Sequence, residues 1–139
     1  MDTNVLIAGL LFASGMGREI LELAEGGEFV LLLPEVVRRE VEAVIARDFP
    51  DHLASLGRWL QGAWRVTPMP SVHQVRQALR YVTDPKDAPL LASVLQAQPD
   101  YFVTNDIAHF HTALIKRLLR ERGIELRTPY GFLKALGRR

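Results

Sequence analysis

The sequence predicts an α/β fold: a three-layer α/β/α sandwich with a central parallel sheet, in one domain over residues 1–139. Two observations predict it. The stretches "FVLLL" (29–33) and "YFVT" (101–104) are short and almost wholly apolar, as expected for strands buried on both faces of a sheet. Longer stretches with helical periodicity alternate with them. With 139 residues, 48% of them hydrophobic, the chain can build one core.

The predicted helices are bounded by residues that favour helix ends. The first, over 17–27, ends in Gly26 and Gly27, and the next begins with Pro34 in its first turn. Ser71 is placed to cap a later helix. The remaining predicted elements are helices over 34–47, 50–62, 71–82, 84–98, 111–123 and 130–137, and a strand over 124–129.

The composition excludes some kinds of chemistry. There is no cysteine, so disulfides and thiolate catalysis are ruled out, and any metal site must use oxygen or histidine nitrogen. The net charge of +1 gives no overall field for nucleic acid. No apolar run reaches the length of a membrane span, and no signal peptide precedes Asp2. We therefore expect a cytoplasmic protein with no membrane partner.

Two acidic residues stand out by their positions. Asp106 directly follows the strand predicted at 101–104, at the edge of a parallel sheet where ligands bind. A loop aspartate that bonds its own backbone is an equal alternative. Glu40 falls between Val36 and Val44 on a helical projection, inside the apolar arc. A carboxylate that faces a core needs a cation or several donors, so we favour a functional role over an edge glutamate that reaches solvent.

Two further acids lie in "DPKD", residues 84–87. Asp84 suits the N-cap of a helix whose first residue is Pro85, and helix initiation explains it fully. Helix initiation explains Asp87 only in part, because many residues would serve in that first turn. Asp87 is therefore a second candidate with no complete structural explanation.

The four candidate acids, taken together, predict a metal site. If Asp2, Glu40, Asp87 and Asp106 meet at one sheet edge, their carboxylates repel one another, and divalent cations relieve that repulsion. A set made only of oxygen ligands suits Mg²⁺ or Mn²⁺ better than zinc. Two such ions can clamp a phosphodiester and activate water.

Histidine and basic side chains are weaker candidates. His109 and His111 alternate in "HFH" and could bind metal or phosphate, but we favour the alternative that both are solvated. One helix face carries three cations, and two arginines flank Glu40; both sets are either solvated or a track for phosphates. The residues concerned are Lys116, Arg117 and Arg120, and Arg38 and Arg39.

Four segments together resemble a known family. "DTNVLI", "PEVVRREV", "DPKDAPLLASVLQAQPDYFVTND" and "IELRTPYGFLKAL" are similar to the PIN domain, a family of small α/β/α metal-dependent ribonucleases. The resemblance implies a ribonuclease that uses Mg²⁺ or Mn²⁺ and binds RNA. Many bacterial members are toxins of VapC type, which implies an antitoxin protein as a further partner, and a homodimer is a further expectation. The implied metal ligands are Asp2, Glu40, Asp87 and Asp106, supported by Asn4 and Thr104.

One departure from the family concerns the first strand. PIN domains usually carry an apolar strand before the first acid, and here only Met1 precedes Asp2. We expect this strand to be truncated, so that the strands at 29–33 and 101–104 face a gap. The alternative function is therefore a catalytically impaired PIN fold that serves as a nucleic-acid-binding or assembly module.

Overall fold

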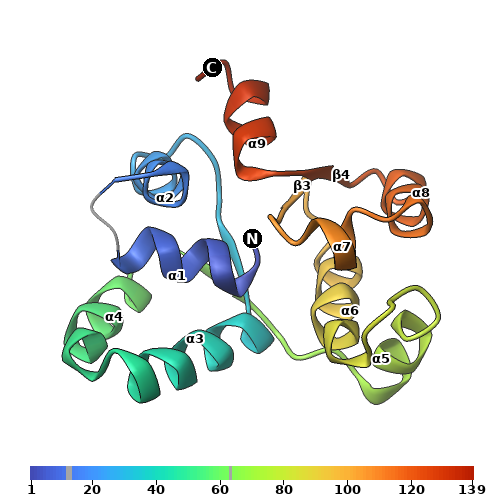
Figure 1. Ribbon diagram of the computed structural model, residues 1–139, viewed down its shortest axis with the longest axis horizontal. Helices are drawn as coiled ribbons and strands as arrows, with labels where there is room; N and C mark the ends of the chain where they lie inside the picture. Colours follow the sequence, from blue (N-terminus) through green and yellow to red (C-terminus); the bar gives the residue numbers. More distant parts are fainter. Residues whose placement is uncertain (12–13, 63) are drawn as a thin grey trace.

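The computed structural model describes residues 1–11, 14–62 and 64–139 (Figure 1). Helices dominate these residues, and short strands lie between them. The elements are α1 (Thr3–Leu11), α2 (Met16–Glu25), β1 (Leu32–Pro34), α3 (Glu35–Asp48), the 3-10 turn η1 (Pro50–His52), α4 (Leu53–Leu60), β2 (Arg65–Thr67), α5 (Val72–Ala78), the 3-10 turn η2 (Pro85–Asp87), α6 (Ala88–Ala97), β3 (Tyr101–Val103), α7 (Ile107–Phe110), α8 (Ala113–Glu121), β4 (Glu125–Arg127) and α9 (Pro129–Ala135).

The strands form two parallel pairs. β1 pairs with β2, with Leu33 opposite Val66, and β3 pairs with β4, with Phe102 opposite Leu126. This is the α/β architecture that the sequence predicts. The described residues do not, however, join the two pairs into one continuous sheet. Each strand is three residues long, shorter than the predicted stretches.

The core is divided among three groups of side chains. One lies between α5, α6, α8 and β3, and a second between α1, α2, α3 and β1. Leu90 of α6 packs against both, so this helix links the two halves of the molecule. The third group joins α2, β3 and α9 around Ile20 and Phe132. Figure 1 shows α1 to α4 on one side, α5 to α8 on the other, and α9 above.

The predicted helix caps are largely confirmed. The Ser71 hydroxyl accepts the Gln74 N–H, and the Gln74 side chain accepts the Ser71 N–H in return. Asp84 accepts the Lys86 N–H at the start of η2. Gly26 follows the last residue of α2. These motifs depend only on neighbouring residues, which is why the sequence reveals them.

The segment after Asp2 is a helix, a form that the sequence did not reveal. Val5 and Leu6 of α1 are buried, while Phe12 lies outside the described residues. α1 crosses α2 closely, since a Cβ on Gly9 would lie 2.7 Å from the Gly17 carbonyl oxygen. No single described helix is long and apolar enough to cross a membrane; α1 and α2 meet those criteria only as a pair bent by 85°.

Candidate active site

The carboxylate of Asp2 is held at the carboxyl end of β3. Asp2 is buried, and its backbone N–H donates to the Val103 carbonyl at 3.1 Å. Its Oδ1 accepts the Val5 N–H and thereby caps α1. Its Oδ2 accepts the hydroxyl of Thr104, a fully buried residue. The polar start of the chain is therefore a helix cap anchored on a strand end.

Thr104 connects Asp2 to the loop that carries Asp106. The same Thr104 hydroxyl accepts the Asp106 N–H at 3.0 Å. Asp106 then caps α7, because its Oδ1 accepts the His109 N–H at 3.2 Å. Phe110 fixes this short helix by packing edge-on against Phe102 of β3. The strand end thus presents two carboxylates on one hydrogen-bonded framework.

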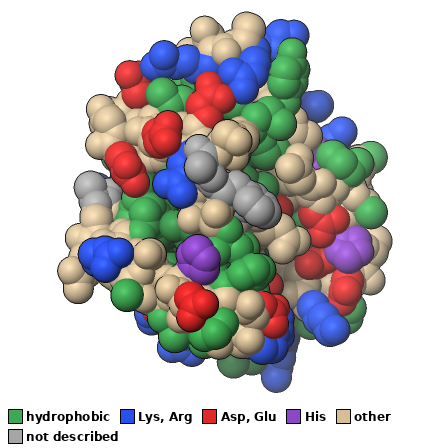
Figure 2. Space-filling model, turned by 60° about the vertical axis from the view of Figure 1, so that its left-hand side comes forward, with side chains coloured by type: hydrophobic (Ala, Val, Ile, Leu, Met, Phe, Trp, Pro, Cys, Tyr) green, Lys and Arg blue, Asp and Glu red, His purple; other side chains and the backbone are tan. Residues whose placement is uncertain are grey.

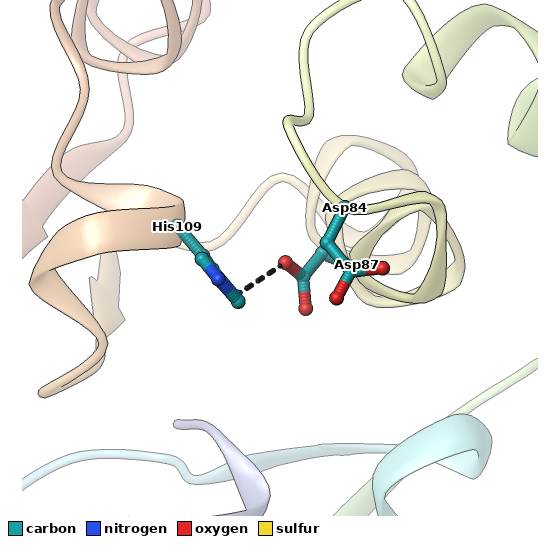
Figure 3. Close-up of side chains that lie close together, drawn as sticks. All are labelled: Asp84, Asp87 and His109. Carbon is teal, nitrogen blue, oxygen red and sulfur yellow. Dashed lines mark ion pairs between the residues drawn. The ribbon is translucent and has the colours of Figure 1, made fainter.

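His109 joins Asp106 to Asp87. Its Nδ1 lies 3.2 Å from Asp106 Oδ2 and 2.9 Å from Asp87 Oδ2. Figure 3 shows His109 reaching from α7 toward Asp87, with Asp84 beside it. One ligand atom each from Asp84, Asp87 and His109 lies within 4.8 Å of the others. In the surface view, a group of acidic side chains surrounds a histidine at the right-hand edge of the molecule (Figure 2).

Asp87 is the least satisfied member of this cluster. Its Oδ2 is buried and meets no donor of good hydrogen-bond geometry among the described residues; the His109 Nδ1 atom, 2.9 Å away, is its ion-pair partner. Burial raises the pKa of Asp87; His109 opposes this, and Asp106 and Asp84 add to it. Two carboxylates therefore pair with one histidine and a third, that of Asp84, lies beside them, which leaves an excess of negative charge.

Glu40 departs from its predicted position. It is exposed on α3, so the prediction that its carboxylate faces the core is wrong. Val37 and Val41 carry the buried face, and Glu40 lies at its border, where a long side chain reaches water. Its Oε2 accepts the Thr3 hydroxyl at 3.1 Å, next to Asp2 in the chain. Glu40 is tied to the segment that holds Asp2, and its place among the metal ligands stays a prediction.

The remaining predicted site residues fall into two groups. Asn4 is exposed on α1, and Lys116, Arg117 and Arg120 are exposed on α8. Arg38 and Arg39 instead pair with acids of their own helix. Arg38 contacts Glu35 and Glu42, and Arg39 contacts Glu35. The α8 cations are therefore better placed to meet a phosphate than the α3 arginines.

A comparison with protein families shows which family the chain belongs to. A family model described as "PIN domain" matches residues 1–108, more than three quarters of the chain. The chain belongs to the PIN domain family. No curated protein matches it. The matched residues of this PIN domain include Asp2, Glu40, Asp87 and Asp106, all the predicted acidic ligands.

The two histidines of this PIN domain were not predicted as site residues. His109 contacts both Asp87 and Asp106, and His111 Nε2 lies 2.9 Å from the Thr104 carbonyl oxygen. The expectation that both are merely solvated is therefore wrong. Their alternation in "HFH", directly after a candidate acid, was the signal. The sequence does not show that α7 lies close to η2, and this proximity is what brings His109 to Asp87.

The residues present fit a divalent cation. The orphaned Asp87 oxygen and the neighbouring carboxylates are ligands of the kind that Mg²⁺ and Mn²⁺ prefer. His109 adds a nitrogen, so the cluster is not the all-oxygen set that we expected. Imidazole is a better ligand for Mn²⁺ than for Mg²⁺.

Proposed function

We propose that this PIN domain is a ribonuclease that cleaves RNA phosphodiester bonds with the help of Mg²⁺ or Mn²⁺. The observation that carries the proposal is the unbalanced charge at the end of β3. His109 pairs with Asp87 and Asp106. Asp84 lies beside them, and Asp87 Oδ2 accepts no hydrogen bond from the described residues. Carboxylates gathered at one site repel one another, a bound cation relieves that repulsion, and a cation there can serve phosphoryl chemistry.

Each residue has a proposed role in this reaction. Asp87, Asp106 and His109 would bind the cation directly. Thr104 fixes Asp2 and the Asp106 loop through one hydroxyl. When bound, the cation supplies neutralisation of phosphate charge and activation of water. Asp2 and Glu40 complete the predicted ligand set from α1 and α3.

The proposed substrate contacts lie on α8. Lys116, Arg117 and Arg120 are exposed, and Ile115 and Leu119 anchor the opposite face in the core. This orientation leaves three cations free to meet successive phosphates. α8 follows α7, which carries His109, after two residues. An RNA backbone could therefore extend from the acidic cluster onto this helix.

A cleavage assay tests the proposal. We expect purified protein with Mn²⁺ to cleave a labelled single-stranded RNA, and EDTA to stop the reaction. Exchanging Asp51, an exposed acid of η1, for asparagine should leave cleavage unchanged and controls for loss of surface charge. RNA binding without cleavage at any Mn²⁺ or Mg²⁺ concentration would instead support the alternative, a catalytically impaired nucleic-acid-binding module.

We further propose that the ribonuclease acts as a toxin restrained by an antitoxin protein. The resemblance to VapC-type toxins supports this role, and we expect the reaction to take place in the cytoplasm. Induced expression should arrest growth, and co-expression of a small neighbouring open reading frame should restore it. Growth arrest that persists with Asp106→Asn would separate toxicity from cleavage and contradict the proposal.

A further inference from the structure

A small polar pocket lies between α5, α6 and α8, on the side of the molecule where Figure 1 shows these three helices. Its volume is about 220 Å³, below the range of about 300–1,000 Å³ that is usual for larger ligands, so it suits one small group. α6 contributes residues from Ala92 to Gln96, and a helix rises about 1.5 Å per residue, so the pocket lies roughly 8–14 Å along α6 from Asp87. It is therefore separate from the acidic cluster.

Two arginines give this pocket a positive charge. Arg80 follows α5 and Arg122 follows α8, and both line the pocket, whereas no aspartate or glutamate does. Within residues 1–11, 14–62 and 64–139, neither guanidinium group forms an ion pair or a side-chain hydrogen bond. Arg38 and Arg39, in contrast, pair with acids of their own helix. The pocket therefore offers two planar guanidinium groups to an anion, and their geometry matches phosphate.

Glutamine side chains add hydrogen-bonding groups of both kinds to the pocket. Gln74 Oε1 accepts the Ser71 N–H, which leaves the Gln74 amide N–H groups to serve as donors. Gln96 Nε2 donates to the Pro68 carbonyl, which leaves Gln96 Oε1 to serve as an acceptor. The edge of a nucleobase also carries both donors and acceptors. These two amides therefore complement a nucleobase better than a simple anion, which could use only the donors.

The rest of the pocket is apolar and carries one aromatic ring. Ala92 and Leu118 are buried residues of the core, and both line the pocket. Tyr81 is half-buried; it packs against the same core group and lines the pocket as well. Unpaired bases of RNA stack on aromatic rings and form hydrogen bonds through their edges. The pocket thus combines a phosphate site, a stacking surface and groups that can bond a base.

We propose that this pocket binds one nucleotide, with its phosphate on Arg80 and Arg122 and its base against Tyr81. The amides of Gln74 and Gln96 would bond the edge of the base. A free mononucleotide and a nucleotide within an RNA strand share this chemistry. An RNA source rests on the proposed ribonuclease function, because a strand held here could extend to the acidic cluster. A free nucleotide as the source does not depend on that function.

Titrations of the full chain in EDTA test the proposal without metal-dependent cleavage. The first probe is adenosine 5′-monophosphate (AMP), followed by NMR of the ¹⁵N-labelled protein. We expect saturable binding, with amide shifts in α5, α6 and α8 together. Ribose 5-phosphate and inorganic phosphate lack the base, so both should bind at least roughly tenfold more weakly. A short single-stranded RNA is the second probe. Tighter binding of RNA than of AMP at this pocket would identify a strand as the source, and tighter binding of AMP a free nucleotide.

Arginine variants show whether either probe occupies the pocket. Arg80→Gln and Arg122→Gln should each weaken AMP binding at least roughly tenfold, because each removes charge-assisted hydrogen bonds to the phosphate. Arg76→Gln removes the same charge from an exposed position of α5 outside the pocket and should leave binding unchanged. The NMR spectra of the free variants verify that all three fold.

Three outcomes would overturn the proposal. The first is no saturable binding of either AMP or RNA in EDTA. The second is equal affinity for AMP and inorganic phosphate, which would reduce the pocket to an anion site. The third is binding that survives the double change of Arg80 and Arg122 to glutamine. Absence of Mn²⁺-dependent cleavage alongside intact, arginine-dependent AMP binding would contradict the proposed ribonuclease function alone and leave the nucleotide site standing.

Discussion

Two acidic regions of this PIN domain differ in how far their carboxylates are paired with cationic side chains. On α3, Glu35 contacts Arg38 and Arg39, and Glu42 contacts Arg38. At the candidate site, by contrast, His109 pairs with both Asp87 and Asp106, and Asp84 lies beside them. The first region balances its charge within one helix. The second collects carboxylates from separate parts of the chain and leaves them in excess.

The pKa values record this difference. Hydrogen bonding to Arg38 is the largest cause that lowers the pKa of Glu35, to about 2. Burial raises the pKa of Asp87, and the neighbouring acids Asp106 and Asp84 add to the effect. A carboxylate whose charged form is favoured is explained by structure alone. A carboxylate whose charged form is disfavoured in the free protein is a candidate functional residue, because a bound cation would stabilise that charged form.

The largest difference between the two acidic regions should appear in the rate of RNA cleavage. We expect Asp106→Asn to lower the rate of Mn²⁺-dependent RNA cleavage by at least about 100-fold, because a candidate metal ligand loses its charge. Glu35→Gln removes the same charge from α3 and should leave the rate unchanged. Both variants are measured with one labelled RNA at saturating Mn²⁺. A comparable loss in the two variants would show that the acidic cluster has no special role.

Mn²⁺ should stabilise the protein by binding to the acidic cluster at the candidate site, and the acids of α3 should not contribute to this effect. At about 100 times its dissociation constant, a ligand that binds only the folded state adds about 2.7 kcal/mol of stability. Mn²⁺ should therefore raise the melting temperature by at least about 5 °C. Asp87→Asn should lose most of this rise, whereas Glu42→Gln should retain it.

Differential scanning fluorimetry with and without Mn²⁺ measures both variants. Calcium at the same concentration controls for nonspecific screening of surface charge, and it should give a smaller rise because His109 is a poor ligand for calcium. If Asp87→Asn kept the full stabilisation by Mn²⁺, the cation would bind elsewhere.

The two regions also differ in what the sequence reveals. The capping roles of Ser71 and Asp84 were predictable, because a cap depends on residues within one turn. Asp106 was predictable as a strand-end acid. The contact between His109 and Asp87 was not, because it requires the chain to return from α7 to η2 across about twenty residues of sequence. The charge pairs on α3 join residues three or four positions apart, so they can be inferred from the sequence. The excess of negative charge at the candidate site depends on contacts between distant residues, which only the fold reveals.

Two elements were missed for other physical reasons. α1 is apolar on nearly every side, so it shows no helical period that could distinguish it from a buried strand. β2 has two exposed residues, Arg65 and Val66, and only Thr67 is buried, so it lacks the apolar run of a central strand. The position of Glu40 was misjudged because a helical projection gives an angle and not a depth.

In the metal-free protein, the excess of negative charge at the candidate site should make stability depend on pH. The folded pKa of Asp87 lies above its usual value, so ionised Asp87 lowers stability at neutral pH, and the penalty fades as pH falls through the raised pKa. Asp87→Asn should therefore raise the melting temperature by roughly 2–4 °C at pH 7 in EDTA, and by less at pH 4. A decrease at pH 7 would show that the ion pair with His109 outweighs the burial of the charge.

The smallest expected effect concerns the balanced region. Glu35→Gln removes contacts with Arg38 and Arg39, and pairs of this spacing contribute about 0.2–0.5 kcal/mol each. We expect the melting temperature to fall by about 1–3 °C at pH 7 in low salt, and by less in 1 M NaCl, where screening weakens both pairs.

The folded pKa of Glu35 lies below its unfolded value, so this stabilisation is complete above the unfolded pKa and is lost as pH falls toward about 2. Glu121→Gln, at an exposed position of α8, supplies the control and should change nothing. A stabilising effect of Glu35→Gln would mean that α3 also carries excess negative charge, and the contrast between the two regions would then disappear.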